Sequence, residues 1–405
     1  MDRDSPHPSP LTPHPASPLR LAIDVTAGVN QGAGVGRATR EVVSALAGLS
    51  SPLALTLFYA AERTVVAEEG LAWLRGLAAR HPVVRTRRLP LSPRWTTFLW
   101  LRHRLPLPVE ALTGPADVLL APDFVAPPAI RARTIVTIHD LSYLTVPQYA
   151  DPGLRRYLTA AVPRSLRRAA QVIAVSEATR REAITHLGLP PERVTTVYNG
   201  VDARFRPLDA AARAAARARL GLPERYLLTL GTLEPRKNHV GLLRAFARLT
   251  SLEPDLTLVI GGRRGWLDGP IFDDVRRLGL GDRVRFLGGV HDDDLPDLYA
   301  AATAFAYPSW YEGFGLPPLE ALACGVPVVT SATSSLPEVC GDAALLVDPA
   351  DDAALAAALT RVLRDEPLRA DLARRGPMRA AGFTWAATAG GVLTIINRVG
   401  HRSSR

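Results

Sequence analysis

Lysine is almost absent from this sequence. Of its 48 basic residues, 47 are arginine, and Lys237 is the single lysine. The two side chains are not equivalent, because arginine is a planar fork whereas lysine is a compact ammonium on a flexible stem. The use of arginine almost everywhere else therefore marks Lys237 as a candidate functional residue. The same scarcity excludes a pyridoxal phosphate Schiff base at any other position.

Cysteine and long apolar runs are scarce as well. The only two cysteines, Cys324 and Cys340, give no disulfide framework, and no group of His and Cys has the spacing of a zinc site. No apolar run is long enough to span a membrane. Residues 1–18 contain six prolines and no apolar core, which excludes a signal peptide and predicts a disordered lead. We therefore expect a reduced, cytoplasmic protein.

Several catalytic signatures are missing. The sequence has no G-x-x-x-x-G-K-[ST] phosphate loop and no G-x-S-x-G nucleophile elbow, which excludes two large classes of enzyme. The acidic run 292–294 resembles a metal-binding D-x-D motif. It directly precedes a predicted helix, where acidic residues favour the helix dipole. We interpret it as a helix start and expect no metal site.

The sequence does contain a regular alternation of strand and helix patterns, which predicts parallel, doubly wound α/β sheets. The alternation stops near residue 210 and then starts again. The predicted parts are a lead (1–18), an N-terminal domain (19–208), a C-terminal domain (209–383) and a C-terminal helix (384–405). Strands are predicted at 19–25, 53–59, 118–120, 134–138, 172–175 and 194–197, and then at 226–230, 256–260, 284–287, 304–307, 326–330 and 344–347. A glycine loop is predicted at 26–36.

Positive charge is concentrated in the first half. Residues 1–205 contain 24 arginines against 16 acidic residues, whereas residues 206–405 contain 24 basic against 23 acidic residues. Residues 70–109 contain no acid, and their arginines are Arg75, Arg80, Arg85, Arg87, Arg88, Arg94, Arg102 and Arg104, with Trp95, Phe98 and Trp100 among them. This basic stretch suits an anionic membrane face, a phosphate-bearing acceptor or nucleic acid. An ordinary solvated face is an equal alternative.

The first chemical motif is TLGTLEPRKN, residues 229–238, between a predicted strand and a predicted helix. Gly231 allows the backbone to approach a ligand closely. Arg236 and Lys237 stand next to a helix start, whose amides and dipole favour an anion. Two adjacent cations there suit a diphosphate and could replace a metal in stabilising a leaving group. Taken alone, the motif fits a basic pair on a surface loop better.

The second motif is EGFGLPPLE, residues 312–320, which follows a predicted strand and enters a predicted helix. Gly313 and Gly315 offer backbone amides before that helix, an arrangement that suits an anion. Glu312 and Glu320 could each accept hydrogen bonds from hydroxyls at one end of a sugar nucleotide. On spacing alone, a turn residue and an exposed helix residue would explain them as well.

Together the two motifs resemble a known family. Residues 226–349 carry, in order, LGTLEPRKN, FLGGV and YPSWYEGFGLPPLEALACGVPVV. This pattern is similar to the C-terminal domain of glycosyltransferase family 4, the retaining enzymes with the GT-B fold. The resemblance implies two doubly wound Rossmann-like domains that face each other across a cleft. It also implies that Arg236 and Lys237 hold the donor diphosphate, that Glu312 bonds the transferred sugar and that Glu320 bonds the ribose.

The N-terminal half resembles the family more loosely. The glycines at 32–36 do not have the spacing of the dinucleotide fingerprint, but their position matches the family's first glycine loop. His139 and Asp140 end a strand and match the family's His-Asp position. His139 could donate a hydrogen bond to a sugar hydroxyl, and Asp140 could orient it or act on the acceptor. The implied catalytic residues are His139, Arg236, Lys237 and Glu312, and the implied donor-binding residues are Gly34, Gly36, Gly231, Val290, Gly313, Phe314, Gly315, Leu316 and Glu320.

These features predict a retaining glycosyltransferase that needs no metal or other cofactor. The segments HDLSYL and GTLEPRKN look most like mannosyltransferases that use GDP-mannose in polysaccharide synthesis, and UDP-sugars remain open. The expected partners are a nucleotide-diphosphate sugar, a glycan or lipid-linked glycan acceptor and an anionic inner membrane face, without nucleic acid. The resemblance also implies that the helix from residue 384 crosses back onto the N-terminal domain. The alternatives are another GT-B enzyme, such as a phosphorylase or an epimerase, and an inactive scaffold.

Overall fold

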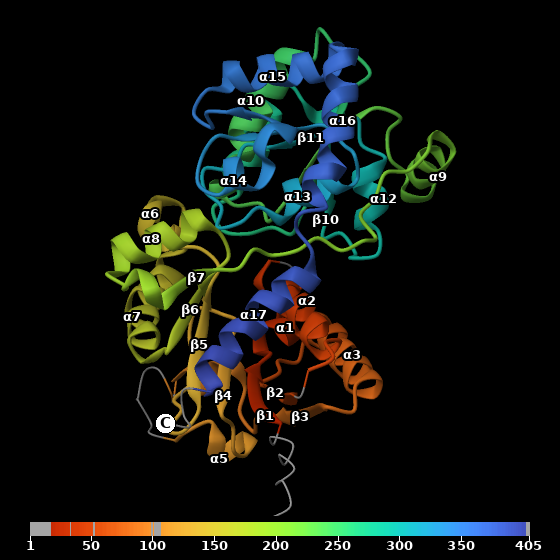
Figure 1. Cartoon of the computed structure of the whole chain (residues 1–405). Helices are drawn as coiled ribbons and strands as arrows, with labels where there is room; N and C mark the ends of the chain where they lie inside the picture. The colour runs from red at the N-terminus through yellow and green to blue at the C-terminus, as the bar shows by residue number, and fades with distance from the viewer. Residues whose placement is uncertain (1–17, 33, 52, 99, 101–106, 402–405) are drawn as a thin grey trace, which may run out of the picture.

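The computed structural model describes residues 18–401 apart from 33, 52, 99 and 101–106. The predicted lead therefore lies almost entirely outside the described residues, as do Arg102 and Arg104. The chain forms two domains, each built on one parallel sheet, and Figure 1 shows them one above the other. This confirms the predicted α/β class with two Rossmann-like domains. Within these residues, no helix is both long and apolar enough to cross a membrane.

The N-terminal sheet has the strand order β3-β2-β1-β4-β5-β6-β7. Its strands are β1 (Leu19–Asp24), β2 (Leu53–Tyr59), β3 (Val84–Arg88), β4 (Val118–Ala121), β5 (Arg133–Ile138), β6 (Gln171–Ala174) and β7 (Val194–Thr196). Strands β4 and β6 are buried along their whole length, as expected for parallel strands with helices on both faces. The helices are α1 (Thr26–Asn30), α2 (Val35–Ala47), α3 (Val65–Arg80), α4 (Pro93–Thr97), α5 (Glu110–Thr113), α6 (Ser142–Thr145), η2 (Pro147–Tyr149), α7 (Pro152–Arg168), α8 (Glu177–Leu187) and η3 (Pro191–Arg193).

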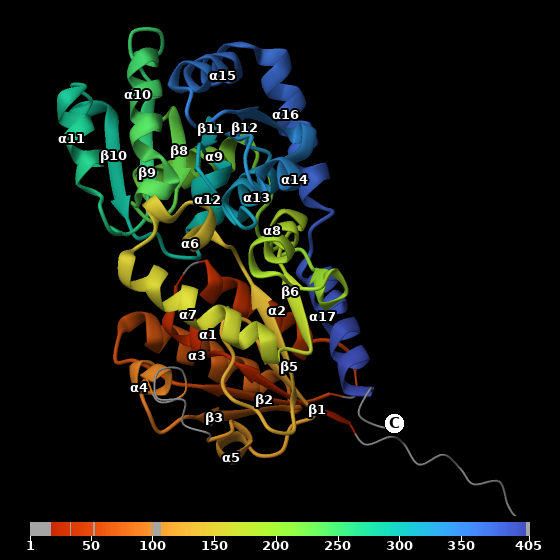
Figure 2. The same cartoon turned by 90° about the vertical axis from the view of Figure 1, so that its left-hand side faces the viewer.

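The C-terminal sheet has the strand order β10-β9-β8-β11-β12-β13. Its strands are β8 (Tyr226–Leu230), β9 (Thr257–Gly261), β10 (Val284–Gly288), β11 (Ala304–Tyr307), β12 (Val328–Ser331) and β13 (Ala344–Val347). The helices are α9 (Ala210–Leu220), η4 (Pro235–Lys237), α10 (His239–Leu249), α11 (Gly269–Arg277), η5 (Gly281–Arg283), α12 (Leu295–Ala300), α13 (Leu316–Ala323), α14 (Leu336–Cys340), η6 (Gly341–Ala343), α15 (Asp352–Arg364) and α16 (Glu366–Ala380). Figure 2 shows α6 and α8 at the boundary between the two domains.

Two elements of the N-terminal domain differ from the prediction. The predicted glycine loop at 26–36 contains the short helix α1. At its end Gly36 packs tightly on Gln31, because a Cβ added at Gly36 would lie 2.1 Å from the carbonyl oxygen of Gln31. Strand β3 was not predicted, because its sequence VRTRR has one buried residue, Val84, followed by four exposed ones. Strand β3 lies at the edge of the sheet, where charged residues discourage pairing with other chains. The same exposed charges remove the apolar pattern by which a strand is recognised in a sequence.

The last helix, α17 (Trp385–Gly400), leaves the C-terminal domain and lies along the N-terminal one, where it packs against α2 (Figures 1 and 2). Val392, Ile395, Ile396 and Val399 are part of the same buried apolar cluster as the first strands. A Cβ at Gly391 would lie 3.1 Å from a methyl group of Val197. This glycine, which departs from the family pattern, therefore allows α17 to pack closely.

Candidate active site

The loop that follows β8 places the predicted diphosphate-binding residues. The segments that follow β8 and β9 approach closely at Gly231 and Gly262. A Cβ added at Gly262 would lie 1.8 Å from the carbonyl oxygen of Gly231, so this approach requires a glycine. Asn238, whose φ is +55°, caps α10 by accepting a hydrogen bond from the backbone nitrogen of Gly241 at 3.2 Å. Lys237 therefore lies directly before a helix N-terminus, whose positive end favours an anion.

Glu312 lies at the centre of a buried cluster. Its Oε1 accepts hydrogen bonds from Lys237 Nζ at 2.6 Å and from Ser309 Oγ at 2.7 Å. The Tyr307 hydroxyl donates to the same oxygen at 3.0 Å. The other oxygen, Oε2, faces Arg236 Nη1 at 3.1 Å. The sequence motifs at 229–238 and 312–320 thus meet at one carboxylate.

The charges of this cluster fix its protonation. Burial alone would raise the pKa of Glu312, but Lys237 and Arg236 outweigh burial and lower that pKa to about 2. Burial and Arg236 lower the pKa of Lys237, and Glu312 opposes this change. Arg236 also faces Glu234 at 2.6 Å, so two cations balance two carboxylates. Glu312 is therefore ionised at neutral pH and held in one orientation.

Glu320, in α13, has a different environment. Its Oε2 accepts a hydrogen bond from the Tyr299 hydroxyl, and its Oε1 faces Arg37 Nη1, both at 2.8 Å. Arg37 belongs to α2 of the N-terminal domain, so this ion pair spans the domain boundary. Burial raises the pKa of Glu320 more than Arg37 and Tyr299 lower it.

Gly313, the first glycine of the second motif, lies at the contact between the domains. A Cβ at Gly313 would lie 1.7 Å from the carbonyl oxygen of His139. The Gly313 carbonyl accepts hydrogen bonds from Ser176 Oγ at 2.7 Å and from Thr179 Oγ1 at 3.1 Å. Gly315, whose φ is +107°, precedes α13 in a conformation that favours glycine. The backbone of this segment is therefore tied to the N-terminal domain.

The ring of His139 does not have the geometry of the predicted hydrogen-bond donor. Its Nε2 lies 2.6 Å from the carbonyl oxygen of Pro122, which can only accept, so Nε2 carries the proton. Burial lowers the pKa of His139, so the ring is neutral and its Nδ1 is an acceptor. Asp140 acts on this ring through its charge, which opposes the lowering of the His139 pKa, and its Oδ1 accepts hydrogen bonds from the backbone and hydroxyl of Ser142. In this geometry His139 can serve a sugar hydroxyl only as an acceptor, whereas an action of Asp140 on the acceptor stays a prediction.

A cleft of about 680 Å³ lies beside the Glu312 cluster. The N-terminal domain supplies most of its lining, and Arg236 and Trp266 reach it from the C-terminal domain. Asp24 and Asp123 are among the residues that line it, and burial, with the charge of Asp24, raises the pKa of Asp123 to about 7. The cleft thus presents hydrogen-bonding carboxyl groups close to one of the two predicted diphosphate ligands.

The remaining predicted donor-binding residues lie around these centres. Gly34, whose φ is +58°, precedes α2, the helix that carries Arg37. Val290 follows β10 and lies against Gly261, where a Cβ would be 3.1 Å from a Val290 methyl. Phe314 is buried and packs on Phe383 with ring centroids 5.9 Å apart. Leu316 is partly buried in the core of the C-terminal domain. Phe314 and Leu316 thus pack in or against the core, and their contact with the donor stays a prediction.

The acidic run 292–294 does precede a helix, α12, as predicted. Each of its carboxylates faces an arginine: Asp292 faces Arg40 at 3.4 Å, Asp293 faces Arg204 at 3.7 Å and Asp294 faces Arg219 at 2.6 Å. Arg40 belongs to the N-terminal domain, and Arg204 to the segment that connects the two domains. The pairs of Asp292 and Asp293 therefore link the C-terminal domain to the part of the chain that precedes it.

The sequence prediction missed several residues of the site. They are the partners of the two glutamates, namely Arg37, Tyr299, Tyr307 and Ser309. A signal existed for Arg37, which directly follows the glycine loop at the start of a helix. The tyrosines gave none, because both lie in buried apolar segments that also fit an ordinary core.

Comparison with solved structures shows the fold. Sucrose-phosphate synthase from Thermosynechococcus elongatus superposes with a TM-score of 0.71 over 94% of this chain and 99% of that chain, at 23% identity. The Anabaena protein HepE, solved in complex with UDP and glucose, superposes with a TM-score of 0.71 over 93% of this chain, at 20% identity. The WaaG glycosyltransferase, involved in lipopolysaccharide biosynthesis, also has a TM-score of 0.71. The two-domain arrangement is therefore the GT-B fold.

Comparison of sequences shows the family. Residues 213–379 match "Glycosyl transferases group 1", and residues 32–205 match "Glycosyltransferase Family 4". O-antigen chain mannosyltransferase B of Escherichia coli is 40% identical over 267 residues, which are 65% of this chain and 70% of that protein. The chain belongs to glycosyltransferase family 4, and it is a glycosyltransferase.

Other relatives are matched over smaller shares of their length. D-inositol 3-phosphate glycosyltransferase of Salinispora arenicola is 41% identical over 241 residues, which are 56% of this chain and 54% of that protein. The serotype-specific mannosyltransferase WbdA of Escherichia coli is 31% identical over 64% of this chain and 32% of that protein. The match thus spans about half of the length of the Salinispora protein and about one third of the length of WbdA.

Proposed function

We propose that this protein is a retaining mannosyltransferase that transfers mannose from GDP-mannose to a glycan or lipid-linked glycan in polysaccharide biosynthesis. The observation that carries the proposal is the buried cluster in which Lys237 and Arg236 meet Glu312, at 2.6 and 3.1 Å, next to the cleft. The choice of mannose is supported by the 40% identity to O-antigen chain mannosyltransferase B.

In this proposal the cluster binds the donor and stabilises the departing nucleoside diphosphate. Arg236 and Lys237 exchange part of their contact with carboxylates for contact with phosphate oxygens, and the N-terminus of α10 adds to this attraction. Glu312 then accepts hydrogen bonds from hydroxyls of the transferred sugar. Two fixed cations can supply the charge stabilisation that a metal ion supplies elsewhere, so the reaction is proposed to need no metal.

The other predicted residues receive roles that fit their geometry. His139, neutral and protonated on Nε2, accepts a hydrogen bond from a sugar hydroxyl through Nδ1. Glu320 accepts hydrogen bonds from the ribose once Arg37 releases one of its oxygens. The acceptor hydroxyl approaches from the 680 Å³ cleft and attacks the anomeric carbon on the face from which the diphosphate leaves, and its proton passes to the departing phosphate oxygen. That geometry retains the anomeric configuration.

Thermal unfolding with nucleotides tests the donor site. GDP and GDP-mannose at about 100 times their dissociation constants should each stabilise the protein by about 2.7 kcal/mol in the presence of EDTA. Lys237→Ala and Glu320→Ala should abolish the shift, whereas Glu69→Gln, an exposed site on α3, should retain it. A selective response to UDP would agree with a glycosyltransferase but would contradict GDP-mannose as the donor. No response to any nucleotide would contradict the donor site.

The second half of the test follows the product. Purified enzyme, GDP-mannose and a mannose-terminated acceptor should give a new glycosidic bond, and NMR of that bond should show the α configuration of the donor. Inverted configuration would contradict the retaining mechanism. Activity that EDTA removes and Mg²⁺ restores would contradict metal independence.

The basic stretch supports a peripheral contact with an anionic membrane. On β3, Arg85, Arg87 and Arg88 are exposed, and Trp95 of α4 is 56% exposed. Reversing the charge of Arg87, Arg88 and Arg94 should weaken binding to phosphatidylglycerol vesicles roughly a hundredfold, at about 1 kcal/mol per arginine. Arg248→Glu, on α10 of the other domain, is the control. Unchanged binding would contradict the membrane contact. The role of these arginines would then be to prevent other chains from pairing with the edge strand.

A further inference from the structure

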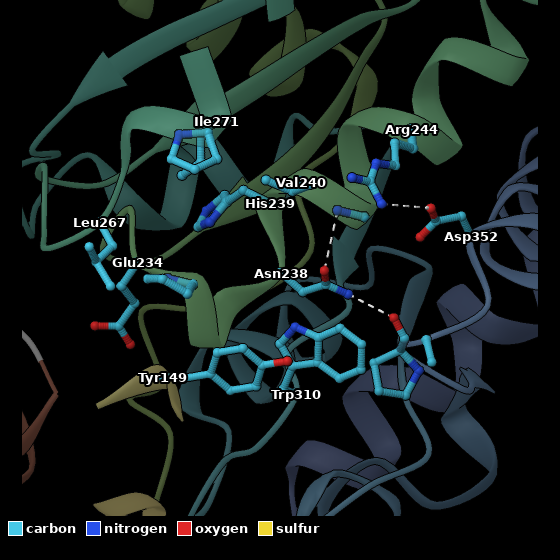
Figure 3. Close-up of a pocket in the computed structure, with 15 residues that line it drawn as sticks. Tyr149, Glu234, Asn238, His239, Val240, Arg244, Leu267, Ile271, Trp310 and Asp352 are labelled. Carbon is cyan, nitrogen blue, oxygen red and sulfur yellow. Dashed lines mark hydrogen bonds and ion pairs between the residues drawn. The ribbon is translucent and has the colours of Figure 1, made fainter. Parts of the chain in front are cut away.

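A second pocket lies at the domain boundary. Its volume is about 280 Å³, at the lower end of the range for small-molecule sites. Figure 3 shows the side chains that line it, most of which come from the C-terminal domain. Tyr149 of η2 lines both this pocket and the 680 Å³ cleft. We call it the Tyr149 pocket.

One wall of the Tyr149 pocket is aromatic. The rings of Tyr149 and Trp310 stack with centroids 5.7 Å apart and planes 19° apart, one ring from each domain (Figure 3). Trp266 Nε1 donates a hydrogen bond to the Tyr149 carbonyl at 2.9 Å, which fixes this wall from the cleft side. Leu267 and Ile271 add apolar surface. Aromatic rings of this kind pack well against the C–H face of a pyranose.

The polar side of the pocket contains a buried acceptor without a partner. His239, the first residue of α10, is 2% exposed and lines the pocket. Its Nδ1 has no hydrogen-bond partner in the described part of the chain. Burial and the charge of Lys237 lower its pKa to about 4, so the ring is neutral at pH 7. A ring N–H donates to the backbone of Glu234, and because Nδ1 has no partner this donor is Nε2, so Nδ1 can accept from a ligand hydroxyl.

The charges that line the pocket are balanced. Glu234 faces Arg236 at 2.6 Å, and Asp352 faces Arg244 at 3.8 Å, so each carboxylate has an arginine beside it. Neither an anion nor a cation gains a free counter-charge here. An aromatic wall, an unpaired acceptor and balanced charges together favour a neutral ligand with many hydroxyl groups.

We propose that the Tyr149 pocket is a carbohydrate subsite that binds a neutral sugar unit of the acceptor glycan, away from the unit that receives the transferred sugar. The acceptor role rests on the proposed function, whereas the binding of a neutral sugar does not. Tyr149 borders both cavities, so a glycan chain that leaves the cleft passes this residue on its way to the pocket. The subsite selects acceptors that already carry more than one sugar.

Direct binding tests the pocket without any transfer. Saturation-transfer NMR of the full chain with methyl α-mannoside and α-mannotriose, in the absence of nucleotide, should detect binding. Leu267→Trp fills the pocket from an exposed position, so it should weaken binding at least about tenfold. Leu252→Trp, the same change at an exposed leucine elsewhere in this domain, should leave binding unchanged. His239→Phe, which keeps the ring shape but removes Nδ1, should also weaken it.

Three results would overturn the subsite. They are no binding of either saccharide to the unsubstituted protein at millimolar concentration, unchanged binding in Leu267→Trp, and tighter binding of mannose 6-phosphate than of methyl α-mannoside. Each is read from binding alone. Failure of the proposed function would instead appear as a missing response to nucleotides, which Leu267→Trp should leave intact.

The acceptor role is tested by transfer. With acceptors of one and of three mannose units, Leu267→Trp should raise the KM for the longer acceptor about tenfold and leave its kcat unchanged. The KM for the single-unit acceptor should not change. Equal KM values for both acceptors in the unsubstituted enzyme would overturn the acceptor role even if sugars bind the pocket.

Discussion

Glu312 and Glu320 are the same residue type in one motif, and both are buried, but they differ in where their cations come from. Glu312 faces Lys237 and Arg236 of its own domain, whereas Glu320 faces Arg37 of the other domain. The first arrangement persists whatever the domains do, and the second exists only while they touch. The pKa of Glu312 is correspondingly lowered to about 2, and that of Glu320 is raised. The motif thus combines a permanent centre with one that depends on domain contact.

The largest effect is expected when the permanent centre is broken. Glu312→Gln leaves Lys237 and Arg236 with one carboxylate, Glu234, and removes a charged acceptor from the proposed sugar site. We expect kcat to fall about 10²- to 10³-fold and the free energy of unfolding to fall by about 3 kcal/mol. Steady-state kinetics and urea unfolding measure the two. A variant with unchanged kcat would contradict the role of Glu312 in catalysis.

The two glutamates should also show opposite dependence of stability on pH. The lowered pKa of Glu312 stabilises the fold by up to about 3 kcal/mol above pH 4.5, and this contribution is lost as the pH falls towards 2. The raised pKa of Glu320 means that ionisation costs stability as the pH rises above 4.5. Urea unfolding from pH 3 to 7 should therefore show a deficit of Glu312→Gln that grows with pH and a relative gain of Glu320→Gln. If the free energies of unfolding of both variants ran parallel to that of the unsubstituted protein over this pH range, the two glutamates would not differ in the way proposed.

A smaller effect is expected when the domain-dependent centre is broken. Arg37→Met frees Glu320 from its cation, so the ribose no longer competes with an ion pair. We expect nucleotide binding to become about three- to tenfold tighter, about 1 kcal/mol, whereas Lys237→Met should weaken it. Isothermal titration with GDP measures both. Weaker binding in Arg37→Met would mean that Arg37 itself contacts the donor.

The smallest effect is expected from a neutral contact between the domains. Ser176→Ala removes the hydrogen bond to the Gly313 carbonyl and the cap of α8. It should lower the free energy of unfolding by about 1 kcal/mol. The affinity for GDP should not change, because Glu312 keeps both of its cations. A loss of affinity in this variant would show that the permanent centre also depends on domain contact.

The strands with buried apolar runs could be predicted from the sequence, and so could the two motifs at their ends. The alternation of such runs with helical patterns is a local signal, and the fold class followed from it. The joint site of Arg236, Lys237 and Glu312 was implied instead by the resemblance of their two motifs to glycosyltransferase family 4. Strand β3 could not be found, because four of its five residues are exposed and charged or polar. Its position is set by pairing with β2, which is not a local property.

The partners of the glutamates could not be predicted for a related reason. The glycine loop before Arg37 marks it as a candidate site residue, but Arg37 meets Glu320 only because the two domains touch, and no pattern in either segment identifies its partner. The acceptor character of the His139 ring depends on the carbonyl of Pro122, a residue in a different loop. The Tyr149 pocket likewise joins residues of both domains. Side-chain chemistry can be assigned from sequence more readily than the partners that tune it.

The position of α17 has a consequence for how the protein is made on the ribosome. The buried cluster of the N-terminal domain includes Val392, Ile395 and Val399 of α17, which are synthesised after the whole C-terminal domain. A Cβ at Gly400 would lie 2.8 Å from a side-chain carbon of Leu19, so the last helix touches the first strand. Nascent domains usually fold in order of synthesis, but here we expect the core of the first domain to be completed only by a helix that is made after the second domain. Until then α2 exposes apolar surface, and we expect chaperones to engage the nascent chain there.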